Sequence, residues 1–381
     1  MGKPIAPTSP AGPTASTPRI FHSVQILRGV AASLVVLAHM AESMQDRIPH
    51  LDVRAWEWGG FGVDIFFPIS GYVMVLAAAR SAGWTDFASR RLIRIVPLYW
   101  FFTAAKLLSF PLAPDLRVHP YHFDFWHVAA SFLFIPSQND DGEWLPILPV
   151  GWTLTYEMIF YAVVATAIIL RCRPIIFATA VIVPVALAGL IFDPPNLMGR
   201  LVDSLMIEML FGMLIAEGVA AIRRIPLILT SLIAIAAFAS VMFDWQIVPS
   251  AFAKFHMTLP RFIVYGVPGA LLLVAAIRIE QSFDLSRLRL LHLIGDASYS
   301  TYLVHGFLTA LLGTLVARYA LMQPLGLAVI EAITLVLSTA AGIIFYKFAE
   351  APVLAWLSAR RRHAPYSSAG GADARQPANV E

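Results

Sequence analysis

Ionisable side chains interrupt several long apolar runs of this sequence, where an ion is costly to hold. They are Arg28, His39, Asp64, Glu157, Glu208, His305 and Glu331. A charge inside hydrocarbon costs at least ~2.5 kcal/mol, so residues of this kind indicate a functional site. Imidazole and carboxyl groups are the side chains that most often transfer protons in enzymes. The set therefore predicts acid–base chemistry inside an apolar bundle.

Arg28 and His39 form the clearest pair, because their spacing places them on one helix face. They are eleven positions apart, which on an α-helix is about three turns plus ~20° and a rise of ~16 Å. We therefore expect a stripe with a guanidinium at one end and an imidazole at the other. A snorkelling arginine and a buried, satisfied histidine are the structural alternative.

Asp64 and Glu157 are expected at the depth of His39. Each lies near the start of an apolar run that crosses in the direction opposite to the run holding His39. Three titratable groups then meet at one level, which suits proton transfer. Asp64 is expected to orient the imidazole or to pair with a cation; a carboxylate at a helix entry is the alternative. The same arrangement would suit a proton-coupled transporter.

Basic residues at the start of the third apolar run form a second candidate site. Arg91 and Arg94 are three positions apart on one helix face, with Arg90 beside them. Guanidinium groups at this spacing are suited to clamping phosphates. The usual enrichment of positive charge at the cytoplasmic ends of spans is the alternative explanation.

Possible metal ligands gather in the stretch 111–150. They are His119, His122, Asp124 and His127. Aromatic residues interleave them, so we interpret the stretch as an interfacial belt and expect no metal. The single cysteine, Cys172, excludes a disulfide framework or a cysteine-based zinc site.

The composition indicates whether the elements that position these residues lie in water or in lipid. The chain is 58% hydrophobic and 13% charged, and its mean hydropathy is +0.72. Soluble domains carry about 25% charged residues. A chain this apolar needs lipid around much of its surface, so we predict an all-α, polytopic membrane helix bundle.

About ten apolar segments are long enough to cross a bilayer as helices. They span 23–43, 59–80, 92–110, 152–171, 174–192, 203–221, 226–243, 260–278, 296–317 and 324–348. A further apolar patch at 126–136 is short, and we interpret it as an interfacial or re-entrant piece.

The distribution of arginine orients this bundle. With ten spans, one side collects clusters of basic residues: Arg80, Arg90, Arg91, Arg94, Arg171, Arg173, Arg223, Arg224, Arg278, Arg287, Arg289 and Arg360 to Arg362. The positive-inside rule makes this side cytoplasmic, together with both termini. The predicted location is an inner (cytoplasmic) membrane, with multiple crossings. The net charge of +3 is thereby explained without a nucleic-acid partner.

Two polar tails flank the bundle. Residues 1–19 are rich in Pro, Ser, Thr and Ala, and we predict a disordered tail without a cleaved signal. The membrane domain is expected over 20–358. Residues 359–381 begin with basic side chains and continue as a second disordered tail.

Several separated stretches, in order, resemble the acyltransferase 3 family of bacterial membrane O-acyltransferases. They are Arg28 with His39 (Arg-X10-His), 61–72 (FGVDIFFPISGY), 90–100 (RRLIRIVPLYW), 151–161 (GWTLTYEMIFY), 295–305 (GDASYSTYLVH) and Glu350-Ala351-Pro352. The wording of 151–161 is most similar to the exopolysaccharide-modifying branch. Pro68 stands where the family has an aliphatic residue, which predicts a kink.

The resemblance implies acetyl-CoA, or another acyl-CoA, as donor. It implies a cell-surface polysaccharide or its lipid-linked precursor as the carbohydrate acceptor, with polysaccharide biosynthesis machinery as a possible partner. We expect the CoA phosphates on Arg91, Arg94 and Arg28. His39 would be the general base on the acceptor hydroxyl or the transient acyl carrier, and Glu157 or Asp64 would orient its ring.

The sugar cleft is expected to be lined by Trp152, Tyr156 and Tyr302, with His305 as a second candidate base. A transporter, for example a flippase of a lipid-linked sugar, is the rival function from another class. Inverted repeats would favour it, but the two halves show no clear pairing. A membrane scaffold is harder to reconcile with so many intramembrane ionisable groups.

Overall fold

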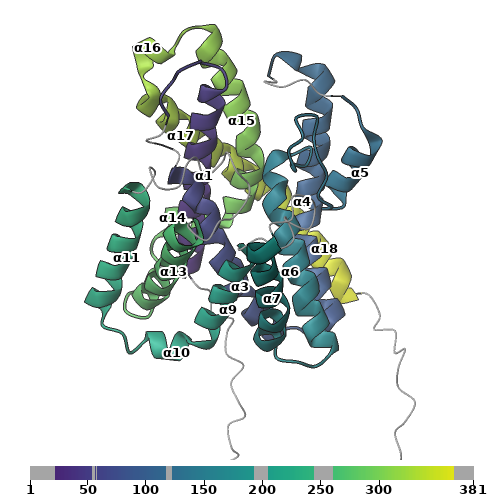
Figure 1. Ribbon diagram of the computed structural model, residues 1–381, viewed down its shortest axis with the longest axis vertical. Helices are drawn as coiled ribbons and strands as arrows, with labels where there is room; N and C mark the ends of the chain where they lie inside the picture. The colour runs from purple at the N-terminus through teal and green to yellow at the C-terminus, as the bar shows by residue number, and fades with distance from the viewer. Residues whose placement is uncertain are drawn as a thin grey trace, which may run out of the picture.

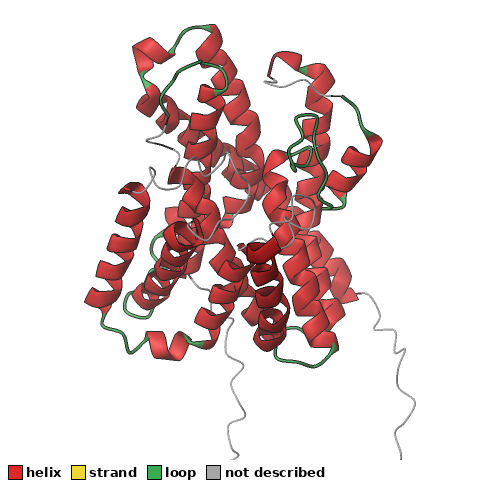
Figure 2. Cartoon of the chain, viewed as in Figure 1, coloured by secondary structure: helices red, strands yellow, loops and turns green. Residues whose placement is uncertain are grey.

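The computed structural model describes residues 22–53, 56, 58–116, 122–192, 205–243 and 261–363. Every regular element within these residues is a helix (Figure 2). The all-α prediction is therefore confirmed for the described part of the chain. The tail 1–19 and most of the tail 359–381 lie outside the described residues.

Seven helical segments among the described residues are long and apolar enough to cross a membrane. They are α1 (His22–Gln45), η1 with α3 (Trp58–Gly60, Phe61–Ala79), α4 (Trp84–Leu112), η3 with α6 (Pro149–Gly151, Trp152–Ile169), η4 with α13 (Phe262–Gly266, Val267–Glu280), α15 (Ser298–Arg318), and α17 with η5 and α18 (Leu327–Phe345, Tyr346–Glu350, Ala351–His363). Each coincides with one of the predicted spans.

The three other predicted spans correspond to shorter helices. These are α7 (Pro174–Phe192), α9 (Leu205–Glu217) and α11 (Leu227–Phe243). Residues 193–204 and 244–260, next to them, lie outside the described residues. The connecting helices α10 (Val219–Ile222) and α16 (Met322–Leu325) lie at opposite ends of the molecule (Figure 1). The count of ten spans and the side of the termini therefore stay predictions.

The apolar patch at 126–136 forms the short helix α5 (Phe125–Phe132). Asp124 caps it by accepting hydrogen bonds from the backbone N–H groups of Trp126 at 2.9 Å and His127 at 3.3 Å. Eight residues extend only ~12 Å, far short of a bilayer core. An eleventh crossing here is therefore excluded by length.

Helices α3 and α9 touch through their backbones. A Cβ atom at Gly71 would collide with the carbonyl oxygen of Met209, and one at Gly212 with that of Pro68. Small residues allow this approach between helices in lipid. Pro68 remains inside α3, and its carbonyl packs on the second helix.

Helices α1, α15 and α17 pack against one another (Figure 1). The Ser43 hydroxyl donates to the Thr309 carbonyl at 3.0 Å, which ties α1 to α15. A Cβ at Gly342 would collide with the Thr301 hydroxyl, which shows how closely α17 approaches α15. These three helices hold the predicted histidines between them.

Two carboxylates connect distant parts of the chain. Glu280 caps α1 by accepting from the backbone N–H groups of His22 at 2.9 Å and Ser23 at 3.2 Å. Asp86, in the first turn of α4, accepts from Arg90 at 3.0 Å and also from Arg361 of α18. Both ends of the described chain are thus fixed to the bundle.

Candidate active site

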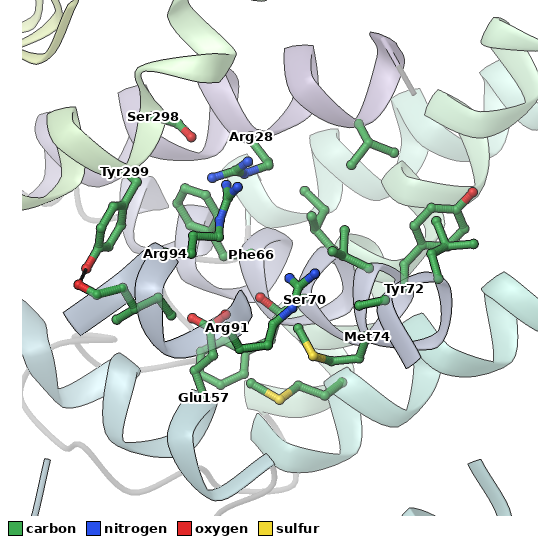
Figure 3. Close-up of a pocket in the computed structure, with 18 of the residues that line it drawn as sticks. Arg28, Phe66, Ser70, Tyr72, Met74, Arg91, Arg94, Glu157, Ser298 and Tyr299 are labelled. Carbon is green, nitrogen blue, oxygen red and sulfur yellow. Dashed lines mark hydrogen bonds between the residues drawn. The ribbon is translucent and has the colours of Figure 1, made fainter. Parts of the chain in front are cut away.

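A cavity of about 450 Å³ opens between α1, α3, α4, α6, α9 and α15. One part of its wall is polar and carries Arg28, Arg91, Arg94, Glu157 and Ser298 (Figure 3). Another part is apolar. Its members include Phe66, Tyr72, Met74 and Met209. The cavity is large enough for part of a cofactor-sized ligand.

Three guanidinium groups converge on the polar wall, as the sequence predicted for Arg28, Arg91 and Arg94. All three side chains are half-buried. Arg28 donates to the Gln25 side chain at 3.1 Å, and the Nε of Arg91 is buried without a hydrogen-bond partner. Three cations beside one carboxylate give this wall a positive charge that suits an anion such as phosphate.

Arg90 belongs to a different set of contacts, although it borders the same cavity. Its guanidinium pairs with Asp86 at 2.9 Å and is exposed. Arg90 therefore belongs to the contacts between α4 and α18, because its partner Asp86 also binds Arg361.

Glu157 lies with the arginines rather than with His39. It borders the cavity and accepts a hydrogen bond from the Tyr161 hydroxyl at 2.5 Å. Tyr161 was not among the predicted site residues, although its position four residues after Glu157 places both on one helix face. These contacts favour a role for Glu157 in ordering the guanidinium groups over one in orienting an imidazole.

The rings of His39 and His305 meet edge-on, with centroids 4.9 Å apart. Nδ1 of His39 lies 2.9 Å from the Val35 carbonyl oxygen. A carbonyl only accepts, so Nδ1 carries the hydrogen and Nε2 the lone pair. This is the tautomer that a base or a nucleophile needs. His305 is fully buried, and its ring nitrogens make no hydrogen bond of normal geometry with the residues that the structure describes, although the backbone of Tyr302 and Thr301 lies nearby.

Tyr302 lies at the cavity wall and beside the histidine pair. Its ring borders the cavity and lies 5.8 Å from that of His305 and 5.9 Å from that of Phe66, centroid to centroid. Its hydroxyl lies 2.9 Å from the Val150 carbonyl and 2.8 Å from the Thr153 hydroxyl. Arg28 borders the cavity, whereas His39 and His305 are not among its lining residues. The two ends of the Arg28–His39 stripe therefore lie in different surroundings.

Asp64 has another partner than the one its depth suggested. It is fully buried and pairs with Arg261 at 2.8 Å, and the guanidinium in turn lies over the Tyr265 ring. Phe66, which faces Tyr302, follows two positions later and is therefore ~200° around the helix. The alternative in which Asp64 pairs with a cation is the one these contacts support.

Trp152 and Tyr156 lie beside a second, smaller depression. Their rings meet at right angles with centroids 6.0 Å apart. The depression holds about 20 Å³ and is bordered also by Trp144 and Thr155. This is room for a water molecule rather than a sugar ring. The two aromatic residues therefore share a site with each other, whereas Tyr302 belongs to the large cavity.

The histidines of the stretch 111–150 have protein partners where they are described. The backbone N–H of His122 donates to Asp140 at 2.6 Å, and the His127 ring lies 2.8 Å from the Ser137 hydroxyl. His119 lies outside the described residues. Within the described part of the chain, no three His, Cys, Asp or Glu side chains are placed to share a metal ion.

Comparison with known proteins agrees with this geometry. Residues 21–347 match the Acyl_transf_3 family, described as an acyltransferase domain. The chain is 31% identical over 310 residues to the exopolysaccharide production protein ExoZ of Rhizobium meliloti (strain 1021), covering 80% of this chain and 92% of that one.

A second relative matches over a shorter range. The O-acetyl transferase of Shigella phage Sf6 is 27% identical over 184 residues, which cover 45% of this chain and 54% of that one. No solved structure matches the chain. With a family match across most of its length and motifs that meet around one cavity, the chain belongs to the acyltransferase 3 family of membrane O-acyltransferases.

Proposed function

We propose that the chain transfers an acyl group, in the first place acetyl, from cytoplasmic acyl-CoA to a hydroxyl of a cell-surface polysaccharide or its lipid-linked precursor. The observation that carries the proposal is the cavity with Arg28, Arg91 and Arg94 on one wall and Tyr302, the neighbour of the His39–His305 pair, on another. Similarity to an exopolysaccharide production protein supports the choice of acceptor.

The arginine cluster is the proposed donor site. Guanidinium groups bind phosphate oxygens through pairs of N–H donors, and CoA carries several phosphates. Glu157, which accepts a hydrogen bond from Tyr161, is proposed to order the cluster through its negative charge. The proposed topology, ten spans with cytoplasmic termini, puts Arg80 and Arg90 at the cytoplasmic mouth of the same cavity.

The thioester is proposed to reach the level of Phe66 and Tyr302, the wall of the cavity next to the histidines. From there the Tyr302 side chain must turn aside before the acyl carbon can meet His39. Loss of its hydrogen bonds to Val150 and Thr153 is the cost of that turn. An enzyme that admits CoA from one side of the membrane and sugar from the other needs such a barrier between the two binding sites.

His39 is proposed to act at Nε2, the nitrogen that carries the lone pair. As general base it takes the proton of the acceptor hydroxyl while the oxygen attacks the acyl carbon. As acyl carrier it would attack the thioester first and hold the acyl group until the hydroxyl arrives. Trp152 and Tyr156 are placed to meet the sugar once their depression widens.

The test is acyl transfer by the purified protein in detergent. Protein, [¹⁴C]acetyl-CoA and de-esterified exopolysaccharide of the producing bacterium are incubated together, and label in the polysaccharide is counted. We expect label in ester linkage that mild alkali releases. A protein that binds the polysaccharide but never consumes acetyl-CoA would instead be a transporter of lipid-linked sugar.

A further inference from the structure

Glu331 of α17 is a buried carboxyl group that the proposed acyl transfer leaves unused. Its side chain is fully buried, and neither carboxyl oxygen has a hydrogen-bond partner among the residues that the structure describes. An unsatisfied buried polar group costs about 1–3 kcal/mol, and an isolated ion costs more. A group kept under such conditions needs an explanation in function or in ordered water.

Glu331 lies on a polar stripe of α17. Thr334 and Ser338 follow it on the same helix face, and all three are fully buried. The Thr334 hydroxyl donates to the Ile330 carbonyl at 2.8 Å, so it is satisfied within its own helix. The Ser338 hydroxyl, like the Glu331 carboxyl, has no hydrogen-bond partner.

Helix geometry places the stripe at the level of the histidine pair. Gly342 of α17 touches Thr301 of α15, and the two helices form a hairpin through α16. Ser338 lies four residues before Gly342 on α17, and His305 lies four residues after Thr301 on α15. Because the two helices are antiparallel, both steps lead toward α16 and cover the same ~6 Å. Ser338 and His305 therefore lie at one level, and Glu331 lies ~10 Å beyond, toward the α16 end.

Three helices close this seam, which we define as His305, Ser338 and Glu331. From the α1 side, His39 meets His305, and Arg47 reaches the level of Gly313 and Thr314. The Arg47 guanidinium also donates to the Ser43 carbonyl at 3.0 Å and to the Leu116 carbonyl at 3.0 Å. The seam thus runs from the catalytic imidazole to the end of the bundle where Arg47 lies.

We propose that Glu331, acting through Ser338 and His305, returns His39 to its neutral form after each acyl transfer by relaying a proton to water at the α16 end of the bundle. The inference rests on the proposed function. In this proposal Glu331 passes protons on and does not touch the substrates.

The bonds and protons of the step balance. The acceptor O–H bond breaks and its proton goes to Nε2 of His39. The C–O bond forms, and the C–S bond breaks with its electron pair on the departing thiolate, which takes a proton from cytoplasmic water. The imidazolium passes its proton to His305, then Ser338, then Glu331. One proton is taken up on the donor side and one is released on the other.

A neutral carboxylic acid suits this place. It accepts a proton on its carbonyl oxygen while it donates the hydrogen of its hydroxyl oxygen. The relay therefore never requires an isolated carboxylate in apolar surroundings, where an ion is costly. Ordered water between Ser338 and Glu331 would complete the path over the ~10 Å that separate their positions on the helix.

The experiment compares E331Q, E331D and T334V in the full-length purified protein, with [¹⁴C]acetyl-CoA and de-esterified exopolysaccharide. E331Q keeps the shape of the side chain but removes the exchangeable acid. We expect its kcat to fall about tenfold or more, its KM for acetyl-CoA to stay within about twofold, and its solvent deuterium isotope effect to rise. E331D should recover most of kcat. T334V, whose hydroxyl bonds within its own helix, is the matched control and should behave as wild type.

The outcomes separate the two proposals. An inactive wild-type protein would refute acyl transfer itself. An active wild type with an unchanged kcat and isotope effect in E331Q would overturn the relay and leave the acyltransferase standing. Equal losses in E331Q and E331D, together with a lower Tm in detergent for both, would assign Glu331 a structural role and overturn the relay as well.

Discussion

The imidazole of His39 is held by its own helix, with Nδ1 2.9 Å from the carbonyl oxygen of Val35. That bond fixes the tautomer of His39 and aims its lone pair away from the backbone. His305, at a centroid distance of 4.9 Å, is held less firmly. Within the described part of the chain its ring nitrogens make no hydrogen bond of normal geometry, and the backbone of Tyr302 and Thr301 lies nearby. The two histidines are therefore chemically distinct, and their substitution should give different losses.

His39→Ala should abolish acetylation, with a loss of at least about 100-fold in kcat, because general base catalysis typically contributes 10²–10⁴. His305→Gln should reduce the rate less, since this residue acts through His39. The measurement is acetyl transfer to polysaccharide by purified variants. His22→Ala, at the other end of the same helix, is the control. Normal acetate content in the polysaccharide made by the His39 variant would end its catalytic assignment.

Arg91→Ala and Arg94→Ala should each weaken acetyl-CoA binding. A hydrogen bond to a charged group contributes about 1.5–3 kcal/mol, which corresponds to a rise in Kd of roughly 10- to 100-fold. Calorimetry with acetyl-CoA measures this directly. Arg173→Ala is the matched control, because Arg173 pairs with Glu217 at 2.8 Å outside the cavity. Equal affinities in all variants would show that the cluster serves topology alone.

Tyr302→Ala should open the cavity toward His39. In a C172S background, the substitution H39C places a thiol behind the Tyr302 ring, and Cys172 is the single cysteine of the chain. A charged maleimide added from the donor side should label this thiol slowly when Tyr302 is present and several-fold faster in the Tyr302→Ala background. Identical labelling rates would mean that Tyr302 does not block the path. This readout is independent of acyl transfer.

Removing one member of the Asp64–Arg261 pair should destabilise the protein strongly. The two side chains are 0% and 10% exposed, and breaking a buried pair costs about 3–5 kcal/mol because an uncompensated charge remains. Asp64→Asn and Arg261→Gln should each lower Tm in detergent, and the double variant should lose less than the sum. Additive losses would show that the two residues stabilise the fold independently.

Acid should weaken the folding of the stretch that holds His127, which lies outside the spanning helices. Burial lowers the pKa of this imidazole, although the carboxylates of Asp124 and Asp140 act in the opposite direction. The unfolded chain, with a pKa near ~6.5, then binds more protons than the folded one. The contribution of His127 to the free energy of unfolding is therefore constant above about pH 6.5. It falls as the pH drops through that value toward the lowered pKa of the folded state.

The check compares wild type with His127→Gln by thermal unfolding at about pH 7.5 and about pH 5. Wild type should lose more stability than the variant, because the amide does not titrate. Parallel losses in the two proteins would assign the acid sensitivity to other groups.

Helix identity and motif positions were predictable from the sequence, whereas the rotation of each helix was not. Asp64 and His39 were expected at one depth, but α3 is apolar on every side, so no pattern showed that Asp64 faces Arg261 and Phe66 faces Tyr302. The partner helices decide these faces. The partner of Glu157 could not be chosen from the sequence for the same reason, since its level fits either the imidazole or the arginines.

The spacing of Arg28 and His39 predicted a shared face, and their helix is continuous. It did not predict that the Tyr302 ring, which lies 263 residues after His39 in the chain, borders the cavity wall beside His305. Only the packing of α1 against α15 brings these residues together. The end of α9 was likewise predicted too late, at residue 221 instead of Glu217, because hydropathy reports composition and not where a helix ends.

The backbone contact of Gly71 with Met209 and of Gly212 with Pro68 limits the width of the cavity. Met74 and Met209, on the same two helices, form part of its apolar wall. The distance between these helices is thus set by two residues that carry a hydrogen atom where others carry a methyl group. Alanine at either position would push the helices apart and widen the cavity beside its methionine side chains.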